Sequence, residues 1–322
     1  MQTINENISV DSQLEKVNEV IKSSLNSDVP LINQIGKYII ESGGKKTRPQ
    51  CLINLAGLAG SVKAVHFQLA AIIELIHTAT LLHDDVVDES EKRRNTPTAN
   101  IKFGNAASIL VGDFLYSRSF QMMVDINNIE IMDVLAFTTN KIAEGEVMQL
   151  ISKNNTDLTE EEYMNIIQSK TGVLFEACGK LAALSNPVDP YQKKALSEIG
   201  KLYGKIYQLV DDILDYSGDA KAIGKNLGDD LKDGKMTLPL LAAYRASNIH
   251  DKELIKSAIV QGDVSQLTRV INIIEKTKSI SYSKNIVLGL MKDLDEKLDL
   301  FDNDYYKHRI RNFFADSINR HF

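Results

Sequence analysis

The sequence predicts an all-α fold, and two observations support this. Apolar residues recur at i, i+3, i+4 and i+7 along most of the 322 residues, with little of the alternation typical of half-buried strands. The six prolines stand where helices are expected to begin or end, because a proline inside a helix costs about 3 kcal/mol. No linker, repeat or low-complexity block interrupts the pattern, so we expect one helical domain over residues 1–322.

The periodic segments give the expected helices in chain order. They cover residues 10–25, 31–42, 49–60, 63–89, 98–126, 129–152, 158–184, 189–217, 237–246, 249–260, 263–276, 280–298 and 302–319. Three polar or glycine-rich stretches are expected to be loops: Ser42–Thr47, Glu89–Thr98 and Gly218–Met236. Each loop adjoins a cluster of charged residues.

Composition argues against several classes of protein. The net charge is −6, which gives no reason to expect a nucleic-acid partner. Cys51 and Cys178 lack the spacing of metal ligands, so we expect buried free thiols in a reducing cytoplasm. The polar start is unlike a signal peptide, and the longest uncharged stretch near it, Pro49–Val62, is too short to span a bilayer. We expect a soluble, cytoplasmic protein.

The stretch Ile73–Arg94 carries a first acidic cluster. It begins as an apolar helix and ends in Asp84, Asp85 and Asp88, followed by two arginines. Residues i and i+4 lie about 40° apart on a helix, so Asp84 and Asp88 present neighbouring carboxylates, with Asp85 about 100° round. A hard divalent cation would offset the repulsion between them. Taken alone, the cluster fits a solvated helix end equally well.

A second cluster repeats the spacing. Asp211, Asp212 and Asp215 again follow an apolar helical run. Two matched clusters on two apolar helices predict facing walls of one cavity, where six carboxylates require positive charge. Magnesium ions that bridge carboxylates to phosphate oxygens meet that requirement. The repeat therefore favours a metal–phosphate site over a solvated surface.

DDVVD and DDILD resemble the two aspartate-rich motifs of the trans-isoprenyl diphosphate synthases. The resemblance covers roughly residues 41–240, and GGKKTRP, FGNAASILVGDF, IAEGEV and GKNLGDDLKDGK are similar to its long-chain, octaprenyl-forming branch. It implies a helical bundle of the isoprenoid synthase type with a central substrate cavity, and a homodimer. It also implies Mg²⁺, three ions per active site with substrate bound. The implied substrates are an allylic diphosphate (farnesyl diphosphate) and isopentenyl diphosphate.

The implied reaction is ionisation, condensation and elimination. Magnesium and basic side chains draw charge onto the departing diphosphate and leave an allylic cation. The double bond of isopentenyl diphosphate attacks this cation, and a proton is lost to the diphosphate. No side-chain base is required, which agrees with the absence of a Ser/His/Asp or Cys/His pattern. The long product would serve a quinone side chain, and its release would involve transient contact with a membrane surface.

A basic loop precedes the acidic motifs. In ESGGKKTRP the glycines allow close backbone approach and the following helix start attracts anions, which suits a diphosphate that no metal carries. A basic surface loop is the alternative. By resemblance, Lys45 and Arg48 bind isopentenyl diphosphate. Lys46 replaces the family's usual arginine and loses its bidentate fork, so it is left out of the candidate site.

Three further candidates flank the first motif. His77 lies about two turns before Asp84 on nearly the same helix face, and the resemblance assigns it to isopentenyl diphosphate. The resemblance also assigns Arg93 to the allylic diphosphate and Arg94 to the isopentenyl one. A structural histidine and charge balance in a solvated loop are the respective alternatives.

The remaining candidates surround the second motif. Lys170, in a helix of small and apolar residues, either extends its ammonium to the surface or, by resemblance, binds the allylic diphosphate beside Thr171 at the reacting carbons. Gln208 shares a helix face with Asp211, and its neutral dipole would stabilise a cation. Lys225 is assigned to the leaving diphosphate and Lys235 to substrate binding.

Product length is expected to depend on the residues below the first motif. Ala79 and Thr80 are small and lie about one turn, 5.4 Å, before Asp84. A growing tail would pass them and run between the expected helices 63–89 and 98–126. Simple close packing of two helices is the alternative. Candidate floor residues on the second of these helices are Phe120, Met122 and Met123.

Other classes of protein share some of these features. A terpene cyclase also uses DDxxD, but a second motif with Asn, Ser and Glu would replace DDILD. A non-catalytic subunit of a heteromeric synthase is expected to lose motif aspartates, and this chain keeps all six. A generic acidic metal-binding protein leaves the basic candidates unexplained. A synthase of shorter, farnesyl or geranylgeranyl products stays open.

Overall fold

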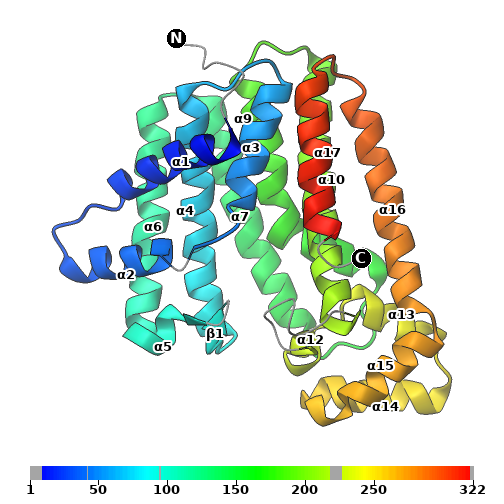
Figure 1. Cartoon of the computed structure of the whole chain (residues 1–322). Helices are drawn as coiled ribbons and strands as arrows, with labels where there is room; N and C mark the ends of the chain where they lie inside the picture. Colours follow the sequence, from blue (N-terminus) through cyan, green and yellow to red (C-terminus); the bar gives the residue numbers. More distant parts are fainter. Residues whose placement is uncertain (1–8, 42, 94–95, 218–226, 320–322) are drawn as a thin grey trace. The chain divides into compact units, whose positions relative to one another are not determined.

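The computed structural model describes residues 9–41, 43–93, 96–217 and 227–319, and these residues are almost entirely helical (Figure 1). The only strands among them are β1 (Lys92–Arg93) and β2 (Thr96–Pro97), which pair antiparallel with Arg93 opposite Thr96. The predicted all-α fold is confirmed.

The chain divides into two compact units, which are described separately. Unit 1 comprises Met1–Thr139, Leu174–Gly200 and Leu300–Ile310, and unit 2 comprises Asn140–Val173, Lys201–Asp299 and Arg311–Phe322. The organisation of residues 1–322 as one domain stays a prediction.

Helix α4 (Ala64–Val87) is the centre of unit 1. It packs most extensively against α6 (Asn105–Ile126), and then against α3 (Thr47–Leu58) and α1 (Val10–Ser24). Every residue from Leu69 to Ile76 is buried, as expected for a helix surrounded by apolar neighbours. Unit 1 also contains α2 (Pro30–Glu41), α5 (Ala99–Phe103), the start of α7 (Ile129–Ser152) and nearly all of α9 (Val173–Leu184).

Unit 2 is built around α13 (Leu238–Ala246). This helix packs on α14 (Ile249–Gln261), α15 (Leu267–Lys276), α16 (Ser279–Leu298) and α8 (Glu160–Ile167). The unit also holds the π-helical turn η1 (Gln168–Gly172), most of α10 (Pro190–Ser217), the short α12 (Asp229–Lys232), the 3₁₀ turn η2 (Val264–Gln266) and part of α17 (Asp304–Asn319).

The predicted elements differ from the observed ones in five places. The helix predicted over 98–126 is two helices, because Gly104 between them takes a positive φ of 87°. The helix predicted over 158–184 contains the π-helical turn, and the one over 263–276 begins with the 3₁₀ turn. Helix α12 and the β1–β2 pair lie in segments predicted as loops. In each case a local hydrogen-bond pattern departs from the apolar period.

Helix α4 is also the one helix of the described residues that is long and apolar enough to cross a membrane. Two thirds of its apolar window is buried inside the structure. This burial is typical of the core helix of a soluble protein.

The two cysteines are free and buried, as predicted. Burial raises the pKa of the Cys51 thiol, and the neighbouring Cys178 adds to the shift. The Cys51 thiol is therefore unreactive at neutral pH.

The N-terminus of α4 depends on a neutral histidine. The Nδ1 atom of His66, the third residue of the helix, accepts a hydrogen bond of 2.8 Å from the backbone N–H of Lys63. Its Nε2 is buried and has no hydrogen-bond partner among the described residues. Burial, reinforced by the charge of Lys63, lowers the pKa of His66 from 6.5 to about 4.

We predict that His66 makes the protein acid-labile. Below pH 6.5 the unfolded chain binds a proton that folded His66 excludes, so stability is lost as the pH falls from 6.5 towards 4, by about 3 kcal/mol in all. Urea unfolding at pH 7 and pH 4.5 should show a smaller loss for His66→Gln than for the wild type. The control variant His250→Gln, at an exposed position, should lose as much unfolding free energy between pH 7 and pH 4.5 as the wild type. Equal losses of unfolding free energy in all three proteins would contradict the assignment of acid lability to His66.

Candidate active site

The first acidic motif lies at the C-terminal end of α4. Asp84 is in the last turn and Asp88 is the C-cap, whose backbone N–H donates to the Asp84 carbonyl at 2.8 Å. Both side chains are half-buried. Carboxylates at this end of a helix are disfavoured by the helix dipole, so the position demands a compensating positive charge.

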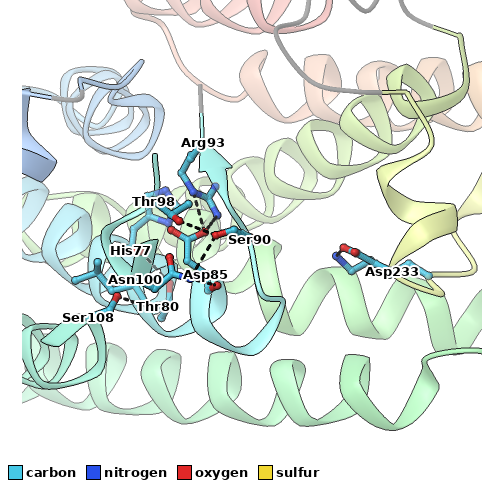
Figure 2. Close-up of polar contacts among 11 residues, drawn as sticks. His77, Thr80, Asp85, Ser90, Arg93, Thr98, Asn100, Ser108 and Asp233 are labelled. Carbon is cyan, nitrogen blue, oxygen red and sulfur yellow. Dashed lines mark hydrogen bonds and ion pairs between the residues drawn. The ribbon is translucent and has the colours of Figure 1, made fainter. Parts of the chain in front are cut away.

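Asp85, between them, is only 5 % exposed and is held by the protein. Arg93 donates to its Oδ1 from Nη2 at 2.7 Å and from Nε at 3.2 Å (Figure 2). Asn100 ties the backbone of the same turn, donating from Nδ2 to the Asp85 carbonyl at 3.1 Å and to the Ser90 carbonyl at 3.3 Å. The β1 strand is thereby fixed beside the motif, with Arg93 still largely exposed.

The basic loop brings two predicted residues together. Arg48, in the first turn of α3, donates from Nη1 to Nε2 of His77 at 3.0 Å, and its guanidinium lies 4.9 Å from the centre of the Phe175 ring. Because arginine only donates, His77 accepts at Nε2 and is neutral in this arrangement. Lys45 is exposed in the loop that precedes α3, and the Lys46 ammonium forms an ion pair with Glu74 at 3.1 Å.

The second motif, on α10 in unit 2, shows a similar division. Asp211 and Asp215 are half-buried, whereas Asp212 is 4 % exposed. Asp212 accepts a hydrogen bond from the Tyr163 hydroxyl at Oδ2 and one of 2.8 Å from Gln208 Nε2 at Oδ1. Burial raises the pKa of Asp212 to about 7, although these two hydrogen bonds oppose the shift.

Asp215 connects α10 to α12. Its two carboxylate oxygens accept the backbone N–H groups of Asp229 and Asp230, each at 3.1 Å. A carboxylate at a helix N-terminus is favoured by the dipole and by the unpaired amides there. Asp230 itself is half-buried, and its pKa is raised, first by desolvation and then by the charges of Asp212 and Asp215.

Lys170 and Thr171 lie on the π-helical turn η1, a conformation that is frequent at functional sites. Lys170 Nζ pairs with Glu146 Oε2 at 2.7 Å, and the Thr171 hydroxyl donates to Gln208 Oε1 at 2.9 Å. Helix α7 approaches this turn closely at Gly145. A Cβ there would lie 2.5 Å from the backbone nitrogen of Lys170.

The other predicted residues are placed as follows. Lys235 pairs with Asp233 at 2.7 Å, and Arg94 and Lys225 lie outside the described residues. Ala79 is fully buried on α4, and the Thr80 hydroxyl donates to the His77 carbonyl at 2.9 Å. Of the predicted floor residues on α6, Met123 is buried, Met122 is half-buried and Phe120 is exposed.

Sequence reasoning missed Glu146 and Tyr163, which contact predicted site residues. Glu146 is the last acidic residue of the IAEGEV segment, so the family resemblance could have indicated it as a site residue. Its ion pair with Lys170 could not have been predicted from the sequence. Tyr163 carries no local signal, because it meets Asp212 from 49 positions away.

Each acidic motif by itself offers carboxylate oxygens, the ligands that Mg²⁺ prefers. Asp84 and Asp88 supply them in unit 1, and Asp211 supplies one in unit 2. Within the described residues, no three His, Cys, Asp or Glu side chains of the structure form a group that could hold a metal ion unaided. The fit is therefore to a cation that takes further oxygens from water or from a bound diphosphate.

Comparison with known proteins identifies the family. A sequence model of the polyprenyl synthetase family matches residues 29–275. The chain is 43% identical over 313 residues to an octaprenyl diphosphate synthase of Haemophilus influenzae, covering 97% of this chain and 95% of that protein. It is 49% identical over 247 residues to the octaprenyl diphosphate synthase of Escherichia coli, covering 77% of this chain and 76% of that protein.

A solved structure of a decaprenyl diphosphate synthase from Rhodobacter capsulatus superposes with a TM-score of 0.92 at 35% identity, over 97% of both chains. A heptaprenyl diphosphate synthase from Staphylococcus aureus gives 0.91 at 26% identity, over 98% of this chain and 99% of that one. The fold is that of the all-helical isoprenoid synthases, and the chain belongs to the polyprenyl synthetase family of prenyltransferases.

Proposed function

We propose that this prenyltransferase makes octaprenyl diphosphate by condensing farnesyl diphosphate with successive isopentenyl diphosphates. The two similar octaprenyl diphosphate synthases support a long-chain product. One structural observation carries the chemistry. Thr171, predicted to lie at the reacting carbons, donates a hydrogen bond to Gln208, whose dipole was predicted to stabilise a cation. Gln208 lies about one turn before Asp211 on α10.

Asp84, Asp88 and Asp211 would hold Mg²⁺, three ions in the complete site, with Asp215 beside them. When bound, the ions neutralise charge on the departing diphosphate. We propose that Asp85 and Asp212, both buried against protein donors, act instead by fixing Arg93 and Gln208. The facing of the two motifs across one cavity stays a prediction.

The basic side chains divide between the two substrates. Lys170 holds the allylic diphosphate, and its ion pair with Glu146 orients the ammonium group. The oxygens of Thr171 and Gln208 stabilise the allylic cation through their dipoles. Arg48, braced by His77 and Phe175, binds isopentenyl diphosphate together with Lys45. Arg93, Arg94, Lys225 and Lys235 complete the proposed diphosphate contacts.

A homodimer is also proposed, in the cytoplasm. Unit 1 exposes large apolar side chains on α5, α6 and α7, which a second copy of the chain would cover. The most exposed of them on α6 are Leu110 at 66 % and Val124 at 58 %. The others in this group are Ile101, Ile109, Phe120, Ile129 and Phe137. Release of a long product would take place at a membrane surface, and the product would supply a quinone side chain.

The decisive experiment is product analysis. Purified protein is incubated with farnesyl diphosphate, excess isopentenyl diphosphate and Mg²⁺, and the dephosphorylated products are separated by chromatography. Eight-unit chains are expected. Products of twenty carbons or fewer would favour a short-chain synthase, and no condensation at all would favour a non-catalytic subunit.

We predict that Asp84→Ala and Asp211→Ala each lower turnover by two or more orders of magnitude, because each removes a charged magnesium ligand. The exposed Asp133→Ala on α7 is the matched control and should retain wild-type turnover. Steady-state kinetics, with circular dichroism to confirm folding, make the comparison. A folded Asp84→Ala or Asp211→Ala enzyme with a near wild-type rate would refute the metal assignment.

The two diphosphates should also be separable by mutation. Arg48→Ala and His77→Ala should raise mainly the KM for isopentenyl diphosphate, because these side chains form one hydrogen-bonded pair. Lys170→Ala should affect the allylic KM and kcat. Equal effects of all three changes on both Michaelis constants would contradict two distinct sites.

Product length should respond to Ala79→Phe. Ala79 is fully buried one turn before Asp84, so an aromatic ring there obstructs any path along α4. The enzyme should still condense, since no proposed ligand is changed, but should release products of about fifteen to twenty carbons. An unchanged long product would show that the chain does not pass Ala79.

A further inference from the structure

A chain of four hydrogen-bonded side chains runs through the interior of unit 2. Tyr163, buried on α8, donates to Asp212 Oδ2, and Asp212 Oδ1 accepts from Gln208 Nε2 at 2.8 Å. Gln208 Oε1 in turn accepts from the Thr171 hydroxyl at 2.9 Å. Three helical segments, α8, α10 and η1, thus meet through one polar network.

The polarity of this network is set at Tyr163. Its hydroxyl donates to Asp212 Oδ2, so the hydroxyl proton is directed to the carboxylate. Asp212 then accepts at both oxygens, which requires Gln208 to present its NH₂ group. The amide oxygen of Gln208 is therefore directed towards Thr171.

We propose that Tyr163 is a positioning residue for the condensation, acting through Asp212 to hold the amide oxygen of Gln208 in place. This inference rests on the proposed function, in which Gln208 and Thr171 stabilise the allylic cation. Without the tyrosine proton, Asp212 loses one of two donors while it remains buried. The Gln208 amide is then free to rotate, and its dipole no longer has one orientation towards developing charge.

Tyr163→Phe tests the proposal, because it removes one oxygen and leaves the packing of the ring. We expect kcat to fall by roughly tenfold or more, with both Michaelis constants within about twofold of wild type. Binding of an allylic diphosphate whose bridging oxygen is replaced by sulfur, measured by calorimetry, should be unchanged, since this analogue ionises poorly. The matched control is Tyr282→Phe, which removes a tyrosine hydroxyl that donates to Glu160 at 2.9 Å in the same unit. It should leave kcat unchanged.

A double-mutant cycle separates positioning from general loosening of the core. If Tyr163 acts through Gln208, Tyr163→Phe should cost little more once Gln208→Ala is present. Multiplicative losses in kcat, or a Tyr163→Phe enzyme that behaves like Tyr282→Phe, would overturn the proposal. If Tyr163→Phe does not fold, Asp212→Asn replaces it in the cycle, because an amide cannot accept at both ends. Multiplicative losses in kcat for Asp212→Asn and Gln208→Ala, or an Asp212→Asn enzyme with wild-type kcat, would then overturn the proposal.

Failure of this inference differs from failure of the proposed function. If the wild-type enzyme condenses its substrates and Tyr163→Phe retains full kcat, only the positioning role of Tyr163 is refuted. A wild-type enzyme that does not condense them removes the function itself.

Discussion

Each acidic motif buries one carboxylate, and the polar contacts that satisfy it organise the residues around it. An uncompensated buried charge costs several kcal/mol, so the fold must supply donors. For Asp85 the donor is Arg93, which the β1–β2 pair and Asn100 hold beside α4. For Asp212 the donors are Tyr163 and Gln208. The residues proposed to act on substrate are thus fixed by the need to satisfy a buried acid.

Helix geometry explains why the second aspartate of each motif has this role. In an i, i+1, i+4 pattern the first and third side chains lie about 40° apart and the second about 100° round. When the helix face that carries the first and third side chains is half-buried, the second side chain points into the core. Asp85 and Asp212 are almost fully buried, whereas Asp84 and Asp211 are half-buried. The same spacing gives the same division on two helices in different units.

Most of the helices were predictable because burial imposes a 3.6-residue period on the sequence. The break at Gly104 was not, since a positive φ leaves the apolar period on both sides intact. The motif aspartates stood out by residue type and spacing, and Arg48 and His77 by resemblance to the family, but the hydrogen bond between Arg48 and His77 was not predicted. Tyr163 was not predictable, because its partner is 49 positions away and a buried tyrosine has no periodic signature. Tertiary hydrogen bonds of this kind do not show in local sequence.

The π-helical turn shows how function constrains a helix interior. A regular helix places consecutive side chains about 100° apart, and η1 widens one turn by an extra residue. In this turn Lys170 reaches Glu146 on α7 while its neighbour Thr171 reaches Gln208 on α10. Gly145 makes the arrangement sterically possible, because any side chain there would collide with the turn. The irregular turn persists because contacts with two helices hold it, and those contacts aim a charge and a hydroxyl from adjacent residues.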